Sequence, residues 1–269
     1  MKKLTTALVS AAAVMTMSTT AFAAENPAEL FDRVMQKNNA VQSVDMQSSV
    51  HSVVLAQDVL PEGQMKVDME MRAQMDVADS ADIKYLAQVA SSVMGQDSYS
   101  LIFYTDGYYY VDANGMKIKY PMPLEQLIAS TQKGLATSSM ESSYMKGLSV
   151  QEVNGRRVLG YEVNTKKLNK SVKEALGSAM DTLGAEGDLA MNIQEMRGAY
   201  VLDENDYIIY MTNYMVYNME ILDQPSTCIT LTETSIKNPG EPVTVTIPST
   251  EGYEDLIGYY DGIAENSAE

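Results

Sequence analysis

The chain has 269 residues, a formal net charge of −17, one histidine, one cysteine and no tryptophan. An acidic surface of this kind repels nucleic acid, anionic lipid headgroups and anionic wall polymers. A single cysteine excludes an internal disulfide, and one histidine leaves too few ligands for a zinc site, so stability must come from an apolar core.

The N-terminus has the three parts of a secretory signal peptide. Lys2 and Lys3 form a basic start, an apolar run follows over residues 7–17, and residues 21–23 read Ala-Phe-Ala, a small-x-small cleavage site. The apolar run is shorter than the roughly 20 residues that span a bilayer. We predict cleavage after Ala23 and a secreted, extracellular or cell-envelope protein. Since no cysteine follows the cleavage site, no lipid anchor is expected there.

A short helix and a strand pair are predicted next. Asn26-Pro27 marks a helix start, and an apolar stripe continues to about Asn38. A strand over residues 44–54 and another over 64–77 flank a Pro-Glu-Gly turn at 61–63.

The second of these strands, QMKVDMEMRAQMDV, alternates strictly between apolar and polar residues. This alternation predicts one buried and one solvent-exposed side. Its apolar side is dominated by methionine, an unbranched and polarizable residue that suits irregular partners but also fills gaps in ordinary cores. A later strand carries methionines at every fourth position. We predict that both sets line or border one concave hydrophobic surface: Met65, Val67, Met69, Met71, Met75, Met211, Met215 and Met219.

Four strands follow in the middle of the chain. Residues 83–94 fit either helical or strand spacing, and their neighbours favour a strand. Short strands over 98–105, 108–112 and 116–120 are separated by Asp-Gly and Asn-Gly, the dipeptides that tight hairpins prefer. The tyrosines of this region suit a half-buried sheet edge, a binding rim or a plain core.

The second half is predicted to contain helices, a further hairpin and long strands. Helices are expected over residues 123–135 and 168–183, and Asn-Gly at 154–155 joins a hairpin. The remaining strands span 188–202, 207–222 and 227–237, and a short helix at 253–256 closes the chain.

No residue pattern indicates catalysis. His51 lies on the polar side of its strand and is interpreted as a solvated residue, while Cys228 is interpreted as a buried, inert thiol. No G-x-S-x-G elbow is present, and the acidic turns lack calcium-loop spacing. We therefore predict a protein that is not an enzyme and has no cofactor and no metal. A hydrolase using paired carboxylates stays open as the third reading.

Several segments together resemble an uncharacterised family of secreted proteins and lipoproteins from Gram-positive bacteria. These segments read NAVQSVDMQSSVH, MKVDMEMRAQMDV, FYTDGYYYVDANGMKIKYPM, VNGRRVLGYEVN and VTIPSTEGYEDL. That family is similar to the LolA-like and LppX/LprG-like lipoprotein-carrier superfamily.

The resemblance implies an α+β fold in which a strongly curved antiparallel sheet, a half-barrel, holds a few helices on its concave face. It also implies an apolar cavity for a lipid or another hydrophobic molecule. We predict a signal peptide over 1–23, a single domain over 24–262 and a disordered tail over 263–269. The expected partners are hydrophobic small molecules and not nucleic acid, with no transmembrane segment in the mature chain. The alternative is an exported structural or interaction module whose helices fill its own core.

Overall fold

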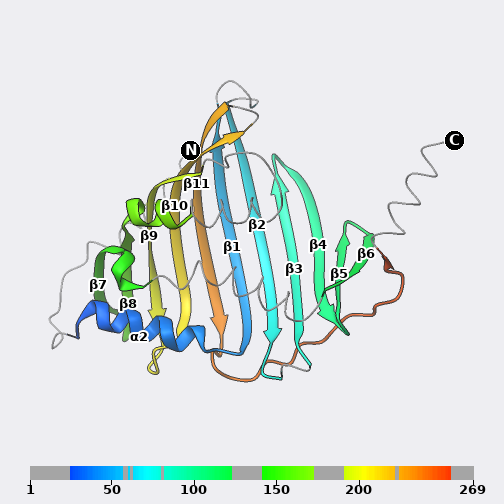
Figure 1. Ribbon diagram of the computed structural model, residues 1–269, viewed down its shortest axis with the longest axis horizontal. Helices are drawn as coiled ribbons and strands as arrows, with labels where there is room; N and C mark the ends of the chain where they lie inside the picture. The colour runs from blue at the N-terminus through cyan, green and yellow to red at the C-terminus, as the bar shows by residue number, and fades with distance from the viewer. Residues whose placement is uncertain are drawn as a thin grey trace. The chain divides into compact units, whose positions relative to one another are not determined.

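The computed structural model describes residues 25–56, 60, 63–79, 82–122, 141–172, 191–221 and 224–255 (Figure 1). Within these residues, twelve strands form one sheet in the order β12-β6-β5-β4-β3-β2-β1-β11-β10-β9-β8-β7. The first six strands are β1 (Ser43–Leu55), β2 (Gln64–Asp76), β3 (Lys84–Val93), β4 (Gln96–Thr105), β5 (Tyr108–Ala113) and β6 (Met116–Pro121). The others are β7 (Met145–Val153), β8 (Arg156–Val163), β9 (Asn192–Leu202), β10 (Ile208–Ile221), β11 (Gln224–Lys237) and β12 (Glu254–Asp255).

The chain divides into two compact units, which we describe separately. The first comprises Met1–Asn38, Ser52–Met65 and Glu141–Glu233, and the second comprises Asn39–His51, Lys66–Met140 and Thr234–Glu269. The divisions fall inside β1, β2 and β11, so each of these strands belongs partly to both units.

The first unit is organised around helix α2 (Pro27–Asn39). The Asn26 side chain accepts a hydrogen bond from the Ala28 amide (3.1 Å), and Pro27 occupies the first helical position, where its missing N–H costs nothing. The apolar stripe of the helix is buried, and Phe31 lies against Tyr161 of β8 and Tyr200 of β9, with ring centroids 6.5 and 6.3 Å apart. Figure 1 shows α2 crossing these strands near one end.

Antiparallel pairs join β7, β8, β9 and β10 in this unit. A 3-10 turn over Ser142–Tyr144 leads into β7, and its Ser142 amide and hydroxyl both donate to the Asp32 carboxylate of α2 (2.8 and 2.7 Å). A second helix begins at residue 165 and is described up to residue 172.

The second unit contains an antiparallel meander from β2 to β6. Its β4–β5 and β5–β6 turns place Asp106 and Asn114 at φ values of 52°, each followed by a glycine with positive φ. That geometry explains why the Asp-Gly and Asn-Gly dipeptides occur there. On one side of the meander, Tyr253 packs edge-on against Phe103 and Tyr110, which are stacked 4.6 Å apart.

The predicted α+β class with a mostly antiparallel sheet and few helices is confirmed, as are the first helix and the strand assignment of residues 83–94. The predicted helix at 253–256 is wrong, because Glu254 and Asp255 pair in parallel with Ile118 and Lys119 of β6 while the ring of Tyr253 is buried. The signal peptide, the 123–135 helix, the second half of the 168–183 helix and the C-terminal tail lie outside the described residues. The single-domain boundaries stay a prediction.

Candidate functional site

The two sides of β2 differ in exposure along its length. Met65, Val67, Met69, Met71 and Met75 are half-buried, and Ala73 is buried. Every polar residue from position 64 to position 72 is exposed. The β2 residues that we predicted to line a hydrophobic surface therefore share the less exposed side of the strand, as the alternation requires.

Strand register continues this apolar side across the second unit. Ala73 pairs with Ala87, which pairs with Ile102 of β4, and the row continues through Val111 of β5 to Ile118 of β6. Directly paired residues point to the same side of a sheet. We call the side that carries these residues and the β2 methionines the methionine face. Its Val89, Ile102, Val111 and Ile118 are half-buried.

The opposite side of β4 and β5 is covered by the chain's own C-terminal segment. Phe103 is fully buried, Tyr110 and Tyr253 are nearly so, and Leu101 and Ile247 pack against them. This layer is an ordinary aromatic core, which is one of the readings that the sequence left open for the tyrosines.

The polar side of β2 is occupied by ion pairs and hydrogen bonds with β1. His51 Nδ1 lies 2.7 Å from Asp68 Oδ1, and Asp45 accepts a hydrogen bond from Gln74 (3.0 Å). The His51 side chain is 47% exposed, so its interpretation as a solvated strand residue is confirmed.

Met211, Met215 and Met219 lie on one side of β10 and are half-buried. Met211 pairs with Tyr200, whose ring contacts Phe31 of α2, so this side is the one on which the helix packs. The β10 methionines belong to the first unit, whereas β2 after Met65 belongs to the second. That both sets border one surface stays a prediction.

Between two of these methionines lies a polar atom without a partner. Asn213 Oδ1 is buried, and it is the one buried side-chain nitrogen or oxygen in the described part of the chain that has no hydrogen-bond partner. Asn213 pairs with Gly198 of β9, beside the stacked rings of Tyr161 and Tyr200. Burial raises the pKa of both phenols, so both stay protonated at neutral pH.

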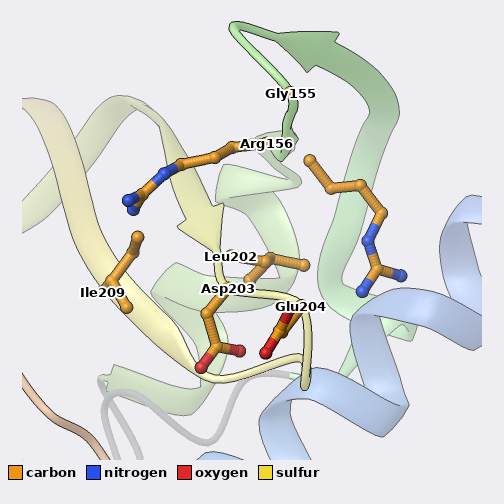
Figure 2. A pocket seen from close by; sticks show the side chains of 7 residues that line it. Gly155, Arg156, Leu202, Asp203, Glu204 and Ile209 are labelled. Carbon is orange, nitrogen blue, oxygen red and sulfur yellow. The ribbon is translucent and has the colours of Figure 1, made fainter.

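A separate pocket of about 410 Å³ lies where the β7–β8 and β9–β10 turns meet in the first unit (Figure 2). Arg156 reaches over the pocket from the β8 side, and the carboxylates of Asp203 and Glu204 lie on the β9–β10 side. Asp203 Oδ1 accepts hydrogen bonds from the Asn205 and Tyr207 amides, which shapes the turn. The lining residues are Gly155, Arg156, Arg157, Leu202, Asp203, Glu204 and Ile209.

An ion-pair network holds this turn against α2. Asp206 accepts from Arg33 Nε (3.0 Å) and from the Arg157 guanidinium, and both arginines also contact Glu25. The Asp206 side chain is only 17% exposed. Asp206 is therefore a structural anchor within this acidic turn. The sequence carried no signal for this contact, since Arg33 and Asp206 are 173 positions apart.

Within the described residues, no cluster of three or more histidine, cysteine or acidic side chains is arranged to hold a metal ion. Cys228 is buried, and burial raises the pKa of its thiol, as expected for the inert cysteine that the sequence predicts. None of the helices in the described ranges has the length and apolarity to cross a membrane.

Residues 26–250 match the model of a family described as a family of unknown function (DUF6612). No curated protein matches the chain significantly. LprF from Mycobacterium bovis is similar at 13% identity, over 83% of this chain and 97% of that one, with a TM-score of 0.40. The lipoprotein LppX from Mycobacterium tuberculosis is similar at 11% identity, over 82% and 100%, with a TM-score of 0.37.

A third similar structure is a β-barrel-like protein of a domain of unknown function, DUF1849, from Brucella abortus. It shares 11% identity over 74% of this chain and 100% of that one, with a TM-score of 0.25. Likenesses at these scores carry no argument about what this chain binds.

Proposed function

Since this chain belongs to DUF6612, a family of unknown function, we propose from its own residues that it is an exported, non-enzymatic binding protein for a lipid or another hydrophobic molecule. The observation that carries the proposal is the methionine face. On β2 the methionines of this face are half-buried, and on β4 and β5 the opposite side of the sheet is already closed by Tyr253 and its neighbours.

The side chains of this face favour binding of apolar ligands of different shapes over catalysis of a reaction. Methionine side chains have three rotatable bonds and a polarizable sulfur, so they adapt to chains of different shape. Met71 pairs with Val89, Met69 with Ser91 and Met75 with Tyr85. The neighbouring row is aliphatic or small: Ala73, Ala87, Ile102, Val111 and Ile118. Such a surface offers contact area and desolvation and supplies no acid, base or nucleophile.

Asn213 gives the methionine side of β10, within the first unit, a polar feature of its own. Its unpaired Oδ1 lies between Met211 and Met215 on the side that faces α2. A buried acceptor without a donor is costly, and a ligand hydroxyl or amide N–H that meets it would remove this cost. A ligand that binds at this side of β10 should therefore be an amphiphile with a hydrogen-bond donor, such as a fatty alcohol or an acylglycerol.

The main test is direct recovery of the ligand. The protein is purified from its native host under mild conditions, extracted with organic solvent, and the extract is analysed by mass spectrometry. Recovery of a lipid in a stoichiometric amount supports the proposal. Absence of any lipid, together with no thermal shift on adding hexadecanol or palmitate, would overturn it in favour of a module that fills its own core.

Matched variants on β2 locate the site. Met69→Lys and Met71→Lys place charges on the apolar side and should weaken binding of the fluorescent fatty acid cis-parinaric acid by about tenfold or more, since each removes roughly 1.5–3 kcal/mol of apolar contact. Glu70→Gln, on the exposed side between them, is the control and should leave binding unchanged. Equal effects of Met71→Lys and Glu70→Gln would place the ligand elsewhere.

A further inference from the structure

The β3–β4 hairpin turn carries an unusual residue. Met94 and Gly95 both have positive φ, 53° and 82°, which defines a type I′ turn. The other non-glycine residues with positive φ in the described part of the chain are all asparagine or aspartate: Asp106, Asn114, Asn154, Asp206 and Asn238. Asparagine and aspartate tolerate the left-handed region because their side chains bond locally, and methionine does not. The hairpin therefore keeps a residue that its backbone disfavours.

Met94 is also the most exposed large apolar side chain among the described residues, at 54%. Val93, Tyr99 and Met116 are exposed too, so four of the seven exposed large hydrophobic residues belong to this region. The Asn114 amide donates to the Tyr99 carbonyl (2.9 Å), which holds the β5–β6 turn beside β4. Figure 1 shows the β3–β4 and β5–β6 turns at the same end of the second unit. We call Val93, Met94, Tyr99 and Met116 the apolar tip.

The charges around the apolar tip have both signs, with an acidic excess like that of the whole chain. Lys66 lies next to the turn, since its carbonyl accepts from the Met94 amide (3.2 Å), and Lys117 pairs with Asp112 across the β5–β6 hairpin. Asp97 lies on the second rung of β4 after the turn. On β2, Asp68 pairs with Ser92 beside Val93, and Glu70 pairs with Ala90, which is opposite Tyr99. These acids outnumber the two lysines, so the region favours a headgroup without net charge over an anionic one.

From this combination we propose that the apolar tip inserts into the surface of a zwitterionic lipid bilayer. A strained, exposed methionine is explained if its side chain gains an apolar environment that the free protein does not provide. Tyrosine is enriched at membrane interfaces, and phosphocholine headgroups carry no net charge, so the acidic excess of the region does not repel them. The proposal goes beyond ligand binding and does not require that the chain hold a lipid.

The first test separates function from folding. Met94→Asn creates Asn-Gly, the dipeptide that type I′ turns prefer, so it should raise the melting temperature while weakening flotation with phosphatidylcholine vesicles by about tenfold. The control is Val153→Ser, which alters a 41% exposed residue beside the Asn154-Gly155 turn of the first unit and should leave vesicle binding unchanged. Vesicle binding by Met94→Asn equal to that of the unaltered protein overturns the proposal.

The second test uses the absence of tryptophan from the chain. Met94→Trp introduces a single reporter whose emission should shift to the blue on adding phosphatidylcholine vesicles, whereas Val153→Trp should show no shift. An unshifted Met94→Trp spectrum, or the same shift for both variants, contradicts insertion at the tip. A Met94-dependent dimer in vesicle-free solution would also overturn the proposal, because the tip would then be an interface between copies of the chain.

Discussion

Gly198 offers the sharpest test of the packing around β9. It pairs with Tyr161 of β8 on one side and with Asn213 of β10 on the other. A Cβ added there would lie 2.1 Å from the Thr212 carbonyl oxygen and 2.5 Å from Tyr161 Oη. The carbonyl belongs to a central strand and cannot withdraw without disturbing the β9–β10 pairing, so Gly198→Ala must displace backbone.

A second glycine in the same unit gives a reference for the loss of stability expected in Gly198→Ala. At Gly147 of β7, the nearest atom to a new Cβ belongs to Glu162, 3.9 Å away, which is ordinary contact. Gly147→Ala should therefore change stability by no more than about 1 kcal/mol, with a small gain because the unfolded chain loses freedom. Gly198→Ala should lose about 3 kcal/mol or more, the upper end of overpacking costs.

Thermal and urea unfolding of residues 24–269, followed by circular dichroism, would measure both variants. For a chain of this size about 3 kcal/mol corresponds to a fall of roughly 6–12 °C in melting temperature. Gly160→Ala adds an internal check, because its Cβ would lie 2.7 Å from the movable Ser149 hydroxyl, and the loss should disappear in the double variant with Ser149→Ala. If Gly198→Ala is as stable as Gly147→Ala, the close packing of Tyr161 over Gly198 is refuted.

Three further predictions concern other parts of the fold. Asp206→Asn removes the carboxylate that joins Arg33 and Arg157, and urea unfolding should show a loss of about 1–3 kcal/mol that shrinks at high salt. Tyr253→Ala removes the edge-on ring over the stacked pair in β4 and β5, and should cost about 3 kcal/mol and expose the C-terminal segment to limited proteolysis. Burial raises the pKa of Tyr109 to about 12, above its ordinary 10.0, so the contribution of the neutral phenol to the free energy of unfolding is fully present below pH 10 and is lost as the pH rises towards 12. Absorbance titration should show one fewer late-titrating phenol in Tyr109→Phe.

Each of these predictions has an outcome that would contradict it. An unchanged unfolding midpoint for Asp206→Asn would mean that the arginines find water or Glu25 equally good partners. Unaltered proteolysis of Tyr253→Ala would show that the C-terminal segment is held by other contacts. If Tyr109→Phe loses a phenol that titrates near pH 10 and keeps all the late-titrating ones, the burial of the Tyr109 hydroxyl is contradicted.

The sequence alone determined the local structure of this protein. A two-residue alternation such as that of residues 64–77 has one buried side in any sheet, and Asn-Gly or Asp-Gly specifies a tight turn from its own backbone energetics. Asn26-Pro27 likewise predicted the start of α2. These signals depend only on neighbours in the chain, which is why the strands from β1 to β11 were identified.

The tertiary structure decided which residues of distant segments these elements contact. Asp206 binds Arg33, which lies 173 positions away in the chain. Residues 254–255, next to the buried Tyr253, pair with β6 as a short strand. Asn213 Oδ1 has no hydrogen-bond partner because of the side chains that surround it in the folded protein. Met94 shows the same limit at a turn, since no local rule predicts a methionine with positive φ. Such features arise from contacts between distant segments, whose free energies do not appear in the periodicity of any one strand.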